Sequence, residues 1–218
     1  MSGAADFLLA ALIVMALYMV STSRLAACVR ASALQGVLLG LLPLALEWAD
    51  GWRPPSLHVL VLAGGALGIK AIVIPRLLLR SMRAAGVRRE VEPMTSLHAS
   101  ILAATVLVGL GFWLANEMVL PFPVASRLLV PAAIANVLLG FLLVVARRQA
   151  ITQVVGYLVL ENGVFVFGLG LAAQQPIVVE LSVLLDVLVG VFVMGIAINH
   201  ISQTFDHVDT AALASLHE

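Results

Sequence analysis

Three ionisable side chains lie within long apolar stretches of this chain: Lys70, Glu161 and Asp186. A charge at the centre of a lipid bilayer costs roughly 2.5–3.5 kcal/mol on insertion scales, so such residues are candidates for function. Carboxylates and amines that gain and lose protons near neutral pH suit a proton relay. We therefore predict that these three residues lie on a proton or ion path.

Glu161 and Asp186 are expected at a similar depth in the membrane. A rise of 1.5 Å per residue puts Glu161 roughly 15 Å from the inner start of its helix, and Asp186 roughly 14 Å from the outer start of the next helix. Burial and mutual repulsion both favour the neutral form of a carboxylate, which suits proton exchange. The alternative is that protonated carboxylates only join helices by hydrogen bonds. Glu180, nearer the outer end, is either an interfacial charge or one end of the path.

The composition requires a membrane to surround these residues. The chain has 218 residues, of which 62% are hydrophobic and 11% charged, whereas a soluble domain carries about 25% charged residues. A formal net charge of zero argues against a partner such as nucleic acid. The single cysteine, Cys28, excludes an intramolecular disulfide and a cysteine metal cluster. No catalytic, cofactor-binding or metal-binding motif is predicted.

An all-α, polytopic transmembrane bundle of about seven helices follows from the apolar runs. A span needs roughly 20 mostly apolar residues. The predicted segments are 4–22, 31–48, 57–79, 97–116, 126–146, 151–173 and 177–200. The corresponding regions are an N-terminal three-helix region with a basic connector (1–95), a fourth helix and outer loop (96–125), a three-helix unit (126–204) and a short tail (205–218).

The arginines set the predicted orientation. The first, third and fifth connections hold nine of them, whereas the second and fourth hold only Arg53 and Arg127. Cytoplasmic loops of membrane proteins carry an excess of Lys and Arg. We therefore expect the N-terminus outside, and the odd connections and the C-terminal tail in the cytoplasm. The nine are Arg24, Arg30, Arg76, Arg80, Arg83, Arg88, Arg89, Arg147 and Arg148.

The segment 147–201 contains RRQAITQVVGYLVLENGVFVFGLGL and then VELSVLLDVLVGVFVMGIAINHI. It resembles the NuoK subunit of respiratory complex I and the C subunit of Mrp-type antiporters. In that family an Arg-bearing inner loop precedes a helix with a buried Glu, and a second buried carboxylate follows with Gly four residues later. Glu161 matches the first carboxylate, and Asp186 with Gly190 matches the second, with Asp in place of Glu.

The full length resembles a longer family, the hydrogenase-4 component E (HyfE) proteins of formate hydrogenlyase and other group 4 membrane-bound hydrogenases. The stretches LENG and LLDVLVGVFVMGI carry this likeness. It implies a multi-pass subunit of the bacterial inner membrane without a redox centre or active site of its own. The expected partners are antiporter-like subunits and the hydrogenase membrane module, and the expected role is a share of a buried proton route.

Three alternatives stay open for function: an Mrp-type cation/proton antiporter subunit, a self-contained secondary transporter and a purely structural spacer. An internal duplication is a separate possibility. In that alignment Leu34-Gln35-Gly36 echoes Leu160-Glu161-Asn162, and Gly64 with Gly68 echoes Asp186 with Gly190. The first three helices would then be a copy that lost its carboxylates and acquired Lys70.

Overall fold

The computed structural model describes residues 3–49, 56–84, 96–119, 124, 126–147 and 150–171. The predicted helix 177–200, with Glu180 and Asp186, and the tail 205–218 lie outside the described residues.

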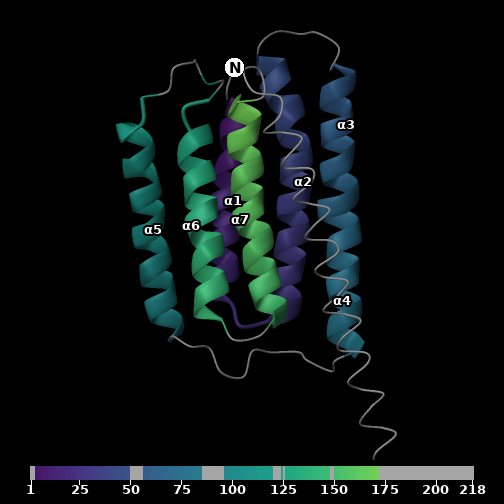
Figure 1. Cartoon of the computed structure of the whole chain (residues 1–218), viewed down its shortest axis with the longest axis vertical. Helices are drawn as coiled ribbons and strands as arrows, with labels where there is room; N and C mark the ends of the chain where they lie inside the picture. The colour runs from purple at the N-terminus through teal and green to yellow at the C-terminus, as the bar shows by residue number, and fades with distance from the viewer. Residues whose placement is uncertain are drawn as a thin grey trace, which may run out of the picture.

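The described residues form helices that alternate in direction along the chain (Figure 1). Helices α3, η1 and α4 follow one another without a break, so the described part of the chain contains six helices that are long and apolar enough to cross a membrane. The prediction of an all-α membrane bundle is confirmed. The elements are α1 (Gly3–Ser21), α2 (Leu25–Ala49), α3 (Leu57–Gly65), η1 (Ala66–Val73), α4 (Ile74–Ala84), α5 (Leu97–Glu117), α6 (Leu129–Ala146) and α7 (Ala150–Leu171).

Two predicted boundaries were wrong. Helix α2 begins at Leu25 and not at residue 31, so Arg30 lies on the helix and not in the first connection. The third span continues to Ala84, beyond the predicted end at residue 79. An amphipathic helix end can carry arginines on its exposed side, and a rule that stops a span at the first charge therefore cuts it short.

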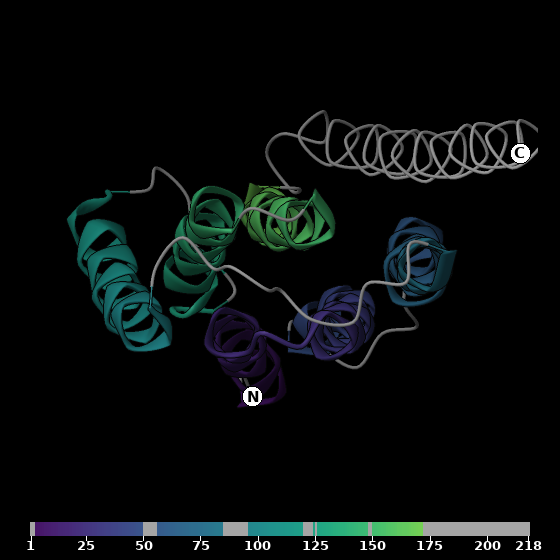
Figure 2. The same ribbon diagram turned by 90° about the horizontal axis from the view of Figure 1, so that it is seen from below.

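The helices form two rows, which Figure 2 shows end-on. One row contains α1, α2 and the α3–η1–α4 helix, and the other contains α5, α6 and α7. Helix α1 packs beside α6 and α2 beside α7, while α6 and α7 form the most extensive pair. The site described below lies between the two rows.

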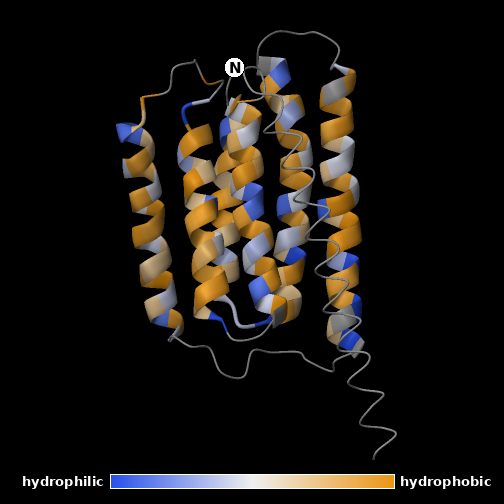
Figure 3. Ribbon diagram, in the orientation of Figure 1, coloured by the Kyte–Doolittle hydropathy of each residue, from blue (hydrophilic) through white to orange (hydrophobic). Residues whose placement is uncertain are grey.

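Figure 3 shows that most of the helix surfaces are hydrophobic, as contact with lipid requires. Helix α5 is the span least covered by the other described helices. Its side chains Leu102, Val106 and Trp113 are each more than half exposed. Hydrophilic residues also occur at mid-height on α7, α2 and the α3–η1–α4 helix (Figure 3). The buried polar residues of these helices include Gln35, Lys70 and Glu161.

Serine side chains begin two of the spans. The hydroxyl of Ser56 accepts a hydrogen bond from Val59 N at 3.3 Å, and that of Ser96 accepts one from Ala99 N at 3.2 Å. Each satisfies one of the free N–H groups in the first turn of a helix. Glu47 also accepts from the Ser56 backbone N–H, which ties the end of α2 to the start of α3.

The middle of the third span is a π-helix, η1, in which the Ile74 N–H bonds to Ile69 O, five residues back. It packs closely on α2 at Gly36. A Cβ at Gly36 would lie 2.6 Å from both Ala71 N and Lys70 C, so only glycine allows this approach. The contact brings the backbone of Lys70 against α2. π-Helical turns are rare and occur often at functional sites.

Helices α6 and α7 approach each other through Gly140, Gly156 and Gly163. A Cβ at Gly140 would lie 2.6 Å from Leu160 Cα, and one at Gly163 would lie 2.6 Å from Ala133 O. Backbone atoms cannot move aside as the end of a flexible side chain can. Small residues at helix interfaces in membranes allow this close packing, and here they fix the position of the turn that carries Glu161.

Gly140→Ala should lower the free energy of unfolding by about 1–3 kcal/mol, because the added methyl group meets the backbone of α7. Unfolding in mixed detergent micelles would measure it. Gly109→Ala is the matched control: no atom lies within 4 Å of a Cβ at this position. The control should leave stability unchanged or raise it by up to about 1 kcal/mol through helix propensity. Equal loss in both variants would contradict the close-packing argument.

Candidate functional site

Lys70 and Glu161 form a buried ion pair between η1 and α7. Lys70 Nζ lies 2.5 Å from Glu161 Oε1, and the two side chains are 4% and 0% exposed. The ammonium also donates to Asn162 Oδ1 at 3.2 Å and lies 5.2 Å from the centre of the Phe165 ring. Three contacts with α7 therefore hold this cation: the ion pair with Glu161, the hydrogen bond to Asn162 and the face of the Phe165 ring.

The directions of the helices explain why these side chains meet. Side chains of an α-helix lean toward its N-terminus. Since the third span and α7 run in opposite directions, the Lys70 and Glu161 side chains lean in opposite directions along the bundle (Figure 1). Their functional groups meet from opposite sides of one layer.

A chain of amide side chains continues from the ion pair across the bundle. Asn162 Nδ2 donates to Gln35 Oε1 at 3.0 Å, and Gln35 Nε2 donates to Asn136 Oδ1 at 3.2 Å. Gln35 Nε2 also donates to Leu12 O, and Asn136 Nδ2 to Ala132 O. All three amide side chains are at most 3% exposed. The chain connects α7, α2, α6 and α1, and it ends on backbone carbonyl groups.

These residues share one depth. At 1.5 Å per residue, Gln35 lies about 15 Å from the start of α2, Asn136 about 15 Å from the end of α6 and Glu161 about 17 Å from the start of α7. These three helix ends lie on the same side of the bundle (Figure 1). The hydrocarbon core of a bilayer is about 30 Å thick, so the polar layer lies near its centre.

Among the described residues of this layer, Lys70 and Glu161 are the ones with titratable side chains. Amide side chains hold fixed donors and acceptors and do not titrate, whereas an ammonium and a carboxylate do. Opposite charges taken out of water are stable only when additional hydrogen bonds compensate the lost hydration. The amides supply these bonds on one side of the pair and give Lys70 and Asn162 fixed positions.

The structure brings together two of the four predicted path residues, Lys70 and Glu161. The sequence predicts Asp186 as the neighbour of Glu161. Asp186 and Glu180 both lie outside the described residues. From the sequence, Gln35 is predicted only as the counterpart of Glu161 in a possible duplication. Its place in the middle of an apolar span also indicates a buried role, because a glutamine there needs a hydrogen-bond partner.

Arg147 is buried, although the sequence placed it in an inner connection. It is 2% exposed, and its Nη2 donates to Val20 O at 2.8 Å. The same nitrogen donates to Thr22 O at 3.5 Å. Val20 is in the last turn of α1, and Thr22 directly follows the helix. The last carbonyl groups of a helix lack partners and carry partial negative charge. Arg147 satisfies them and ties the connection between α6 and α7 to α1.

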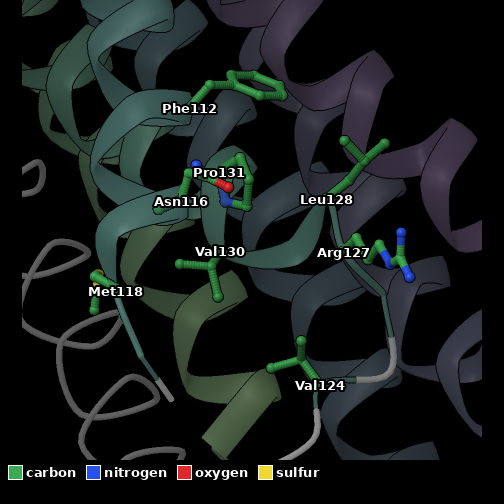
Figure 4. Close-up of a pocket in the computed structure, with 9 residues that line it drawn as sticks. Phe112, Asn116, Met118, Val124, Arg127, Leu128, Val130 and Pro131 are labelled. Carbon is green, nitrogen blue, oxygen red and sulfur yellow. The ribbon is translucent and has the colours of Figure 1, made fainter.

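A pocket of about 560 Å³ lies at the opposite end of the bundle, between α5 and the start of α6 (Figure 4). Phe112 and Asn116 line it from α5, Met118 from just beyond the end of α5, and Val130 and Pro131 from α6. Among the described residues that line it, Arg127 is the charged one. The pocket is far along the helix axis from Glu161 and shares no residue with the ion pair. Among the described residues no group of three metal-binding side chains occurs.

The chain is 31% identical over 214 residues to the uncharacterized protein Rv0085 of Mycobacterium tuberculosis, and the match covers 98% of this chain and 96% of that protein. It is 24% identical over 161 residues to hydrogenase-4 component E of Escherichia coli K12 and of Shigella flexneri, over 73% of this chain and 74% of theirs. No protein-family model and no solved structure matches the chain.

The resemblance to hydrogenase-4 component E that the sequence motifs indicated is thus confirmed as a distant relationship. The likeness of the last third to NuoK stays a prediction. The chain belongs to the family of the M. tuberculosis protein Rv0085, and hydrogenase-4 component E is a more distant relative.

Proposed function

We propose that the chain is a non-catalytic membrane subunit of a complex I-related respiratory or hydrogenase complex, and that Lys70 and Glu161 form one station of its proton path. The observation that carries the proposal is an ion pair at mid-bilayer depth, 4% and 0% exposed. The name of the distant relative, hydrogenase-4 component E, supports the kind of complex. Antiporter-like subunits and a hydrogenase membrane module are the proposed partners, and the bacterial inner membrane is the proposed location.

Protonation of Glu161 would affect both members of the pair. A proton that reaches Glu161 neutralises the carboxylate, and the Lys70 ammonium then loses its counter-charge in a medium of low dielectric constant. The ammonium must find another anion or give up a proton. We propose that Asp186, on the following predicted helix, then pairs with Lys70 or takes its proton. Glu180 would lie nearer the end of the path. Protonation of Glu161 would in this way move charge sideways through the membrane.

The contacts of Lys70 favour a proton over a metal cation such as Na⁺. The ammonium already occupies the position between Glu161 Oε1 and Asn162 Oδ1, and it lies over the Phe165 ring. A metal ion that entered this position would meet a fixed positive charge. A proton needs no such space, because it adds to the carboxylate itself.

Glu161→Gln should abolish proton translocation by the assembled complex. Glutamine keeps the shape of glutamate and offers Lys70 an oxygen acceptor, but it cannot bind and release a proton near neutral pH. The measurement is acidification or alkalinisation of membrane vesicles that carry the intact complex, with assembly checked by native gel electrophoresis. Co-purification with several other subunits would separate this proposal from a self-contained transporter.

Glu117→Gln, at the exposed end of α5, is the matched control and should translocate protons as the parent does. Normal translocation by an assembled Glu161→Gln complex would show that the buried pair only holds helices together.

Lys70→Met should lower the free energy of unfolding by about 3 kcal/mol, because it leaves a buried carboxylate without its counter-charge. Adding Glu161→Gln should restore at least about 1 kcal/mol, since residues in one ion pair are energetically coupled. A double-mutant cycle of detergent unfolding measures this coupling. Strictly additive losses would mean that the two charges do not stabilise each other.

A further inference from the structure

Helix α7 carries a polar stripe that leads away from Glu161. Gln153, Tyr157 and Glu161 are spaced four residues apart and therefore lie on one side of the helix. Gln153 is exposed, Tyr157 is half-buried and Glu161 is fully buried. Between residues 150 and 162 the other polar side chains are Thr152 and Asn162, both buried. The stripe thus grades from the surface to the centre of the bundle.

The stripe runs toward one defined end of the bundle, which we name the arginine-rich end because Arg24, Arg83 and Arg147 lie there. Four residues of an α-helix rise about 6 Å, so Tyr157 lies about 6 Å below Glu161 and Gln153 another 6 Å below Tyr157. Side chains of α7 lean toward its N-terminus, which is this end. The Glu161 carboxylate therefore leans toward the turn of Tyr157.

Among the described residues, the other side chains found around Glu161 do not offer a comparable exit. The amide chain from Asn162 ends on the carbonyl groups of Leu12 and Ala132, which have no proton to pass on. In the direction of the C-terminus of α7, Phe165 and Val166 are apolar and buried. Lys70 closes the side toward η1. Within the described part of the chain, the side chain that combines a transferable proton, partial exposure and proximity to Glu161 is Tyr157.

We propose that the Tyr157 hydroxyl transfers protons between Glu161 and the arginine-rich end, with Gln153 at the mouth of this half-path. The proposal rests on the proposed function of Glu161. In each transfer a water molecule gives a proton to the phenol oxygen as the phenol gives its own proton to the Glu161 carboxylate. The phenol ends unchanged, the carboxylate becomes a carboxylic acid and the donor water is restored from the aqueous side.

Tyr157→Phe tests the hydroxyl directly, because it removes one oxygen atom and keeps the ring that packs against the core. Proton translocation by vesicles with the intact complex should fall at least about tenfold, which corresponds to about 1.4 kcal/mol of barrier. Tyr157→His returns a proton-transferring group and should recover part of the rate. Structural damage alone would not be repaired by histidine, which differs from tyrosine in shape.

Tyr18→Phe is the matched control: Tyr18 is the other tyrosine of the chain, and its side chain on α1 is 46% exposed. It should translocate protons at the parent rate. If Tyr157→Phe works as the parent does while Glu161→Gln does not, the path reaches Glu161 by another route and this inference is wrong. If both variants work normally, the proposed function fails and the half-path with it.

Discussion

The desolvation of two opposite charges at mid-bilayer is the constraint on which the rest of the structure depends. Lys70 and Glu161 lose nearly all contact with water. The attraction between them repays that loss only with short distances and additional hydrogen bonds. Asn162 and the Phe165 ring supply part of the compensation. The glycines supply the geometry, since Gly36 lets η1 approach α2 and so determines how far the Lys70 side chain must reach.

The need of a buried charge for a partner of opposite charge also accounts for Arg147 at the arginine-rich end. A guanidinium that is 2% exposed needs negative partners, and it finds carbonyl groups at the C-terminal end of α1. The two buried cations of the described bundle therefore use different counter-charges: a titratable carboxylate for Lys70 and non-titratable helix carbonyls for Arg147. The first can change with protonation and the second cannot.

The sequence predicts the spans well because an apolar run of about 20 residues has few alternatives in a bilayer. It predicts Lys70 and Glu161 as candidates for the same reason. It cannot predict that they touch, because the contact joins residues 91 positions apart and depends on which helices are neighbours. Arg147 and Arg30 show the complementary limit, since a charge near the end of a span is equally compatible with a loop, a helix surface and a buried cap.

The arrangement of two neighbouring helical hairpins bears on why the chain of hydrogen-bonded amides lies beside the ion pair. The α1–α2 hairpin lies beside the α6–α7 hairpin (Figure 2), and the two run in the same direction (Figure 1), as parallel repeats in transporters do. In the alignment of Leu34-Gln35-Gly36 with Leu160-Glu161-Asn162, Gln35 takes the place of Glu161. An amide at this position of the first hairpin cannot titrate, but it can bond to Asn162 of the second. A second carboxylate there would instead compete for Lys70. Gln35 of one hairpin is thus hydrogen-bonded to Asn162 of the other, next to the ion pair of Glu161 with Lys70.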